Sequence, residues 1–293
     1  MKRGYWILII VIVLAIMIGG YFWLSSGEEP LFAPSDVKVR IRNAPPQITD
    51  VPAVPVAVSL TPGTTTDIIV QFTVRDPNGA DDLNDAAASA TFSKSGEVDR
   101  VGSCVVNSVA GKSKTYDCTV SMQYYDAAGA WTITFYIEDL ATPTPGSDSD
   151  NAAIATIGQL KAILYNTNID LGIITPSDVN VPLADVVITN EGNFVVPTDG
   201  TLNVLARDLV GVTTPAESIL ASVFLAGDSS GDVCTLGSAL IDNSNVNTNV
   251  AIPRGAAGSN VGSLGFCISL VPEVSAQDYE ATVAGGNPWL IEI

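Results

Sequence analysis

The chain has 293 residues, a net charge of −18 and no histidine, and only 15% of its residues are charged. This acidity excludes a surface that neutralises phosphates, so we expect no nucleic-acid partner. The lack of histidine excludes Ser-His-Asp and Cys-His nucleophile systems and histidine-based zinc sites, and we therefore expect no enzymatic activity.

The sequence begins with a short basic tip that is followed by a long apolar segment. Lys2 and Arg3 precede residues 5–24, which carry no charge, and two glutamates follow at 28 and 29. A helix of this length crosses a hydrocarbon core of about 30 Å. The positive-inside bias then predicts that residues 1–4 lie in the cytoplasm and that everything after the 5–24 transmembrane helix lies outside.

Two other interpretations of this segment stay open. A cleaved secretory signal would need a small-x-small site, which Ile18-Gly-Gly20 matches poorly. Lys2-Arg3-Gly4 directly before an apolar helix resembles the class III signal of archaeal and bacterial type IV pilin-like proteins, which are cut after that glycine. This resemblance implies a filament subunit. The aromatic residues at both ends of the segment are typical of a retained span, which we favour.

Residues 25–46 and 47–146 differ in pattern. The first range contains four prolines and little core-forming pattern, so we expect a stalk, with a possible strand at 37–42. In the second range, Trp131-Thr-Ile-Thr-Phe-Tyr-Ile137 alternates between apolar and polar residues, which is typical of a half-buried strand. About seven such runs predict a β-sandwich over 47–146. The clearest are 68–74, 90–92, 104–106, 116–122 and 131–137, with a helical turn as an alternative at 86–90.

A group of turn-forming residues, Thr142-Pro-Thr-Pro-Gly-Ser-Asp-Ser-Asp150, interrupts the apolar pattern. We therefore predict a linker at 147–152 and a second β-sandwich at 153–293, which is long enough for its own core. Its expected strands are 186–189, 201–205, 219–225, 264–270 and 289–293, with a tight turn at 190–193.

The chain contains four cysteines, an even number that indicates disulfides in an exported protein. Cys104 and Cys118 are equidistant from Gly111, so a hairpin that turns there would place them opposite each other. Cys234 and Cys267 then pair by elimination. No C-x-x-C spacing occurs, which disfavours a metal site made of these thiols.

Oxygen-bearing side chains crowd one short stretch: Asp76, Asn78, Asp81, Asp82 and Asp85. Such loops suit calcium, although the spacing does not match an EF-hand. We favour a solvated turn, in which Asp76 and Asn78 bond to nearby backbone groups, and keep calcium as the alternative. A carboxylate-dependent extracellular glycosidase is a further alternative. Whether Asp139 lies near this stretch depends on the topology.

Two pairs of segments resemble a known family. Val74-Arg-Asp-Pro-Asn-Gly-Ala-Asp-Asp-Leu83 and Gly129-Ala-Trp-Thr-Ile-Thr-Phe-Tyr-Ile-Glu-Asp139 resemble immunoglobulin-like modules repeated in archaeal and bacterial cell-surface proteins. Ile188-Thr-Asn-Glu-Gly-Asn193 and Val271-Pro-Glu-Val-Ser-Ala-Gln-Asp-Tyr279 are similar to another immunoglobulin-like class of such proteins. The resemblance covers most of residues 48–293 and implies a fold and a location, but no catalytic residue.

Together these observations predict an all-β chain with two immunoglobulin-like β-sandwich domains after one N-terminal transmembrane helix. We expect a membrane-anchored extracytoplasmic structural or adhesion protein. Its expected partners are the membrane, through residues 5–24, and an unidentified protein or glycan at the cell surface. A homo-oligomer or filament is the alternative that the pilin-like signal implies. We expect no cofactor, apart from calcium at the 76–85 stretch in the alternative above.

Overall fold

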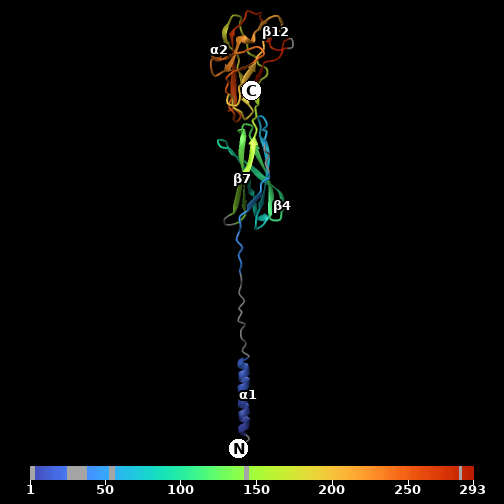
Figure 1. Cartoon of the computed structure of the whole chain (residues 1–293), viewed down its shortest axis with the longest axis vertical. Helices are drawn as coiled ribbons and strands as arrows, with labels where there is room; N and C mark the ends of the chain where they lie inside the picture. The colour runs from blue at the N-terminus through green and yellow to red at the C-terminus, as the bar shows by residue number, and fades with distance from the viewer. Residues whose placement is uncertain (1–3, 25–37, 53–56, 142–144, 284–285) are drawn as a thin grey trace. The chain divides into compact units, whose positions relative to one another are not determined.

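The computed structural model describes residues 4–24, 38–52, 57–141, 145–283 and 286–293 (Figure 1). It divides into two compact units, Met1–Arg42 and Asn43–Ile293. In the first unit, the apolar segment forms a single helix, α1 (Gly4–Leu24). Among the helical residues whose side chains are described, no helix is long and apolar enough to span a membrane. The described stalk residues 38–42 form no strand, while 25–37 lie outside the described residues.

The second unit is built mostly from antiparallel strands, as the sequence predicts. Its first part, residues 43–157, is here called the first lobe and contains one seven-stranded sheet in the order β1-β2-β5-β4-β3-β6-β7. The strands are β1 (Gln47–Asp50), β2 (Thr66–Arg75), β3 (Leu83–Ser93), β4 (Arg100–Ala110), β5 (Ser113–Met122), β6 (Gly129–Asp139) and β7 (Ser147–Ile157). A short 3₁₀ turn, η1 (Ala80–Asp82), precedes β3.

The core of the first lobe follows from alternation along its strands. In β6, Trp131, Ile133, Phe135 and Ile137 are fully buried, while the residues between them are partly or fully exposed. The sheet curls until its two ends meet. The backbone N–H of Ile48 in β1 donates to the carboxylate of Asp148 in β7 at 2.8 Å. The sheet therefore encloses its apolar face and is nearly closed.

Two sequence-based expectations in this lobe are wrong. Residues 147–152, predicted to be a linker, belong to β7, which pairs with β6 from Ser147 onward. The turn-forming residues before Ser147 therefore separate two neighbouring strands of one sheet. Residues 86–90, where a helical turn was the alternative, lie in β3, and the pairing of β3 with β6 shifts register between Asn84 and Ser89.

The β4–β5 hairpin places Cys104 opposite Cys118, and the two form a disulfide. The turn, however, is not centred on Gly111. Ala110 pairs with Ser113, so the centre lies half a residue further along the chain. An irregularity in the pairing between Val106 and Ser108 compensates for this shift. The extra residue of such a bulge restores the register on its far side.

Residues 158–293, here called the second lobe, contain shorter strands in three antiparallel sheets. The largest has the order β15-β14-β17-β10-β8, with β9 also paired to β17, and the others are β16-β11-β19 and β13-β12-β18. The elements are β8 (Ile163–Tyr165), β9 (Val179–Pro182), β10 (Val186–Asn190), β11 (Asn203–Leu205), β12 (Leu209–Gly211), β13 (Ser218–Ile219), η2 (Ala221–Val223), β14 (Phe224–Asp228), α2 (Val233–Leu236), β15 (Ser238–Ala239), β16 (Asn245–Asn247), β17 (Val261–Leu270), β18 (Tyr279–Glu280) and β19 (Leu290–Glu292). The strand predicted at 219–225 is interrupted by η2.

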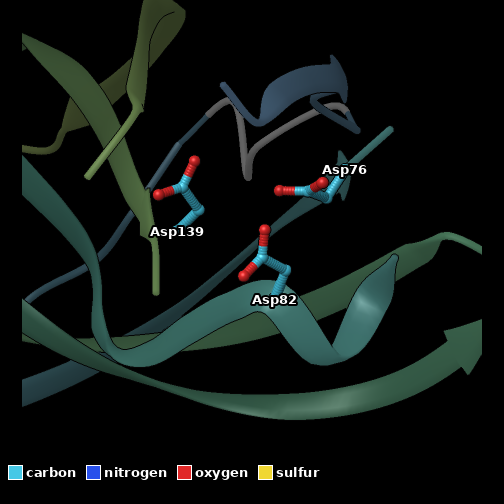
Figure 2. Close-up of side chains that lie close together, drawn as sticks. All are labelled: Asp76, Asp82 and Asp139. Atoms are coloured by element: carbon cyan, nitrogen blue, oxygen red, sulfur yellow. The ribbon is translucent and has the colours of Figure 1, made fainter. Parts of the chain in front are cut away.

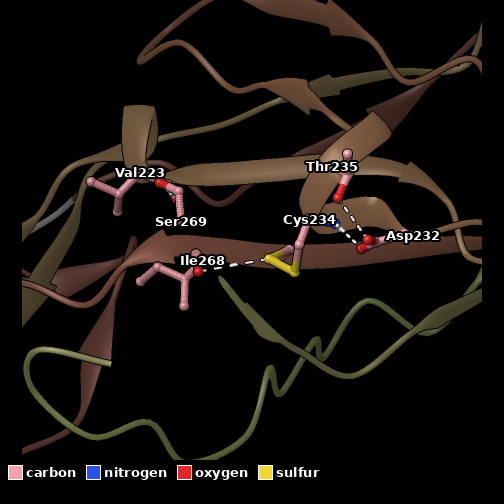
Figure 3. Close-up of a disulfide and its surroundings, with 7 residues drawn as sticks. Val223, Asp232, Cys234, Thr235, Ile268 and Ser269 are labelled. Atoms are coloured by element: carbon pink, nitrogen blue, oxygen red, sulfur yellow. Dashed lines mark hydrogen bonds between the residues drawn. A yellow bond between two sulfur atoms is a disulfide. The ribbon is translucent and has the colours of Figure 1, made fainter. Parts of the chain in front are cut away.

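The second disulfide joins the short helix α2 to the central strand β17 through Cys234 and Cys267 (Figure 3). Asp232 caps α2, because its carboxylate accepts a hydrogen bond from the backbone N–H of Cys234 at 3.1 Å. The hydroxyl of Thr235 also donates to Asp232, at 2.6 Å (Figure 3). This cap holds Cys234 over β17. Both disulfides, with no free cysteine among the described residues, indicate an extracytoplasmic location.

The two lobes share a buried polar contact, here called the latch, formed by Asn190, Asn193 and Asn260. The side-chain amide of Asn193 donates to the backbone carbonyl of Asp126 at 3.0 Å, and that of Asn260 donates to the hydroxyl of Tyr124 at 3.2 Å. Asn260 also donates to the carbonyl of Asn190 at 2.6 Å. These amides are at most 4% exposed, so losing a partner would leave a buried polar group unsatisfied.

An ion pair lies beside the latch. Arg254 of the second lobe binds both carboxylate oxygens of Glu97 in the first lobe and donates to the carbonyl of Tyr125 at 2.8 Å. The hydrogen bond from Arg254 lowers the pKa of Glu97 below its usual value, and this effect outweighs burial, which acts in the opposite direction. The ion pair therefore adds a charge-assisted contact between the lobes.

We predict that breaking the disulfides destabilises the fold in two separate increments. Chain entropy assigns about 3–4 kcal/mol to a loop as long as that between Cys234 and Cys267, and slightly less to the hairpin bridge. Chemical denaturation with and without reductant should show both increments, and the C234A/C267A double variant should retain only the hairpin contribution. Peptide mapping without reduction should find the 104–118 and 234–267 links. A link between Cys118 and Cys234 would contradict the pairing.

We predict that the ion pair between the lobes makes stability depend on pH. Because the pKa of Glu97 is lowered in the folded protein, its contribution is present above the ordinary glutamate pKa of 4.5. It is lost as the pH falls through the lowered value. E97Q should cost about 1–3 kcal/mol at pH 7 and flatten the acid limb of the stability curve. E280Q, at an exposed glutamate, is the control, and identical pH profiles for all three proteins would contradict the assignment.

Candidate functional site

Three aspartates from separate elements meet at one end of the first lobe. Asp76 directly follows β2, Asp82 ends η1 and Asp139 ends β6. Leu83 pairs with Asp139, and the N–H of Leu140 donates to the carbonyl of Asp82 at 2.6 Å, so η1 is held against the end of β6. Gly79 precedes η1 with a φ of 140°, a conformation that favours glycine and lets the chain turn from Asn78 into η1.

The three carboxylates lie close together (Figure 2). One oxygen from each of Asp76, Asp82 and Asp139 lies within 4.8 Å of the other two. Asp76 and Asp139 are 0% and 1% exposed, while Asp82 is partly exposed. These three residues are here called the aspartate cluster.

Hydrogen bonds satisfy the carboxylates unequally. One oxygen of Asp139 accepts from the backbone N–H groups of Ala141 and Gly146 at 3.0 and 2.8 Å, and the other accepts from the side-chain amide of Asn43 at 2.7 Å. In Asp76, Oδ1 accepts from the N–H of Asn78 at 2.6 Å. Its Oδ2 is buried and has no hydrogen-bond partner among the described residues.

The electrostatic consequences differ between Asp82 and Asp139. Burial, together with the charges of Asp76 and Asp139, raises the pKa of Asp82 above its usual value. Burial also acts to raise the pKa of Asp139, but the hydrogen bonds from Asn43, Gly146 and Ala141 outweigh it and leave that pKa lowered. The ionised form of Asp139 is therefore stabilised, whereas the neighbours of Asp82 disfavour its ionised form.

No cation balances the cluster among the described residues. The salt bridges found there are Arg100–Asp126, Lys114–Asp85 and Arg254–Glu97, and none includes a member of the cluster. Lys112, whose backbone carbonyl accepts from the N–H of Asp76, directs its ammonium to the carbonyl of Pro77. Buried charges without a counter-charge are costly, so the cluster favours a positively charged ligand.

The donor set suits a hard cation. Calcium binds carboxylate oxygens at about 2.3–2.6 Å, so two ligands on opposite sides of the ion lie at most about 5 Å apart. The oxygen separations in the cluster fall within this limit. Two of the carboxylates are buried, which makes the cluster a poorer arrangement for a glycosidase, whose carboxylates must flank a sugar.

The structure divides the five residues that the sequence singled out as candidate ligands. Asp76 and Asp82 belong to the aspartate cluster, whereas Asp81 is exposed. The side-chain oxygen of Asn78 accepts from the N–H of Ala44 at 2.9 Å. Asp85, a candidate ligand in the calcium alternative, lies apart from the aspartate cluster, because β3 has begun at this point and turns its carboxylate toward Lys114 and Tyr116, at 2.8 and 2.6 Å.

The predicted turn is present through the hydrogen bond between Asp76 and Asn78, but it is not solvated at Asp76, whose side chain is fully buried. Asp139 was left open by the sequence and joins the cluster. The alternation of buried and exposed residues along β2 and β6 indicates that both of these aspartates are buried. Asp76 continues the buried series of Phe72 and Val74, and Asp139 continues that of Ile137, each two residues further on.

A hollow of about 390 Å³ lies beside α2 in the second lobe. Its polar lining comes from Asp185, Ser229 and Asp232. Asp185 and Asp232 are exposed, and Asp232 is already engaged in capping α2. This hollow therefore offers less to a ligand than the aspartate cluster does.

No protein-family model and no characterised protein matches this sequence. Among solved structures, the secreted serine protease VesC from Vibrio cholerae matches at 10% identity with a TM-score of 0.22. The match covers 76% of this chain and 47% of the protease. A similarity this distant carries no argument for a shared fold or activity.

Proposed function

We propose that this chain is an exported structural or adhesion protein that is held at the membrane by its N-terminal helix and displays two immunoglobulin-like β lobes outside the cell. The observation that carries the proposal is the joining of two disulfide-bonded lobes by the latch and by the Arg254–Glu97 ion pair. Such joining suits a protein that must hold a fixed separation or bear a load outside the cytoplasm.

The anchor part of the proposal depends on the sequence from Tyr5 to Leu24, which carries no charge and falls entirely within α1. The charges on either side of it favour a cytoplasmic N-terminus. The partner outside the membrane would be a protein or glycan of the envelope or of the surroundings. With a net charge of −18, the displayed chain would stay soluble and would repel anionic surfaces.

The proposal assigns no catalytic role to the described carboxylates. The acidic side chains with several hydrogen bonds bind side chains of neighbouring strands and loops. Asp85 binds Lys114 and Tyr116, and Glu217 accepts hydrogen bonds from the serine, glutamine and tyrosine at positions 275, 277 and 279. These contacts lower the pKa of Glu217, with the hydrogen bonds from Ser275 the largest cause. A group held in this way is a poor general acid.

We predict that protease added to intact cells removes both lobes and leaves a protected N-terminal fragment. Intact-mass measurement of the mature protein should find residues 2–4 still attached, because a retained anchor keeps Lys2 and Arg3 on its cytoplasmic side. Protection of the lobes would contradict the orientation. A mature N-terminus at Tyr5, or filaments that contain this chain, would replace the anchor by the pilin-like alternative.

A further inference from the structure

We propose that Asp76, Asp82 and Asp139 bind one calcium ion, and that this ion fixes the segment 43–46 where the chain enters the first lobe. The site is independent of how the protein is anchored and of what it contacts outside the cell. It rests on four observations: an unpartnered buried oxygen, an unbalanced charge, a matching donor geometry and direct contacts to the entering chain.

The unpartnered oxygen is Oδ2 of Asp76. Asp76 is 0% exposed, and no donor among the described residues reaches this oxygen. The carboxylate points into the space that it shares with Asp82 and Asp139 (Figure 2). A buried carboxylate oxygen normally has a hydrogen-bond donor or a metal as its partner. The direction of this one places such a partner inside the cluster.

The charge of the aspartate cluster favours a divalent ion. Three carboxylates lie close together, and two of them are almost fully excluded from water. In the described part of the chain, no Lys or Arg forms an ion pair with any of the three. A monovalent ion would leave most of this charge unbalanced. The donors are all oxygens, which excludes the soft metals that prefer thiolate or imidazole.

Calcium fits better than magnesium. Magnesium requires near-ideal octahedral geometry at about 2.0–2.1 Å and keeps several waters, whereas calcium accepts irregular carboxylate sets at longer distances. Asp139 is pre-oriented by its three hydrogen-bond donors, while the partly exposed Asp82 leaves the site a route to solvent. The remaining ligand positions of calcium would be filled by water from this side.

The entering chain contacts the same groups. The amide of Asn43 donates to Asp139 Oδ2, and the N–H of Ala44 donates to the side chain of Asn78, which itself donates to Asp76 through its backbone. Pro45 lies so close to Gly146 that a Cβ added to Gly146 would be 2.7 Å from the Cα of Pro45. An ion that fixes the positions of Asp76 and Asp139 therefore also fixes the segment 43–46.

The test uses the full chain in detergent, stripped with EDTA and then titrated with calcium chloride or magnesium chloride. At a concentration 100-fold above Kd, calcium should raise the unfolding temperature by about 5–10 °C. D82N should weaken calcium binding at least ten-fold by calorimetry. The matched control is D81N, at the exposed neighbour on the same turn, which should bind calcium as the parent does.

Misfolding of the variant is separated from loss of binding by the measurement in EDTA. There D82N should unfold at or above the temperature of the parent, because it removes a like charge from the cluster. Equal calcium shifts in D82N and the parent would overturn the site. So would the absence of any shift up to about 10 mM calcium, which is about ten-fold above the Kd of about 1 mM at the weak end of extracellular sites. A magnesium shift as large as that of calcium would overturn the choice of ion.

Hydrogen exchange tests the second part of the proposal. Calcium should slow exchange in a peptide spanning 43–50 in the parent and in D81N, but not in D82N. Binding by calorimetry without any change in this peptide would overturn the coupling to the entering chain while leaving the ion site in place.

Discussion

The burial of two carboxylates without a counter-charge among the described residues is the constraint around which one end of the first lobe is arranged. Asp76 and Asp139 continue the inward faces of β2 and β6 past the last apolar residues of those strands. The chain satisfies Asp139 with two backbone N–H groups and the amide of Asn43. One oxygen of Asp76 has no hydrogen-bond partner in the part of the chain that the structure describes. These contacts hold Asn43 of the entering chain, Ala141 after β6 and Gly146 before β7 against Asp139, and Leu140 holds η1 through the carbonyl of Asp82.

The lobes are joined by a different kind of interaction. The latch asparagines and the Arg254–Glu97 pair are directional contacts, so they fix one arrangement more strictly than an apolar surface of similar size would. Arg100 supports the latch from the first lobe, because it holds the carboxylate of Asp126, whose carbonyl accepts from Asn193.

Much of this architecture could be predicted from local pattern. Alternation in 131–137 identified the buried face of β6, and the spacing about Gly111 identified the Cys104–Cys118 pair even though a bulge was needed to keep them opposite. The boundary near residue 147 could not be predicted in the same way. Turn-forming residues act locally, and their pattern does not reveal whether the following strand returns to the same sheet.

The aspartate cluster shows the same limit. Proximity in sequence favoured Asp85, which the start of β3 directs toward Lys114. Proximity in space requires Asp139, which lies more than fifty positions from Asp82 and reaches it only because β3 pairs with β6. The sequence shows that Asp76 and Asp139 each follow an apolar residue at a spacing of two, which places them on the buried face of their strands. Whether they then meet depends on where both strands end.

The arrangement at this end of the first lobe depends most directly on what occupies the space between the three carboxylates. Crystals grown with calcium and measured for anomalous scattering would decide it. We expect a single peak within about 2.3–2.6 Å of one oxygen from each of Asp76, Asp82 and Asp139. The absence of any peak there, with the Asp76 and Asp82 carboxyl groups hydrogen-bonded directly to each other through a shared proton, would contradict a bound calcium ion.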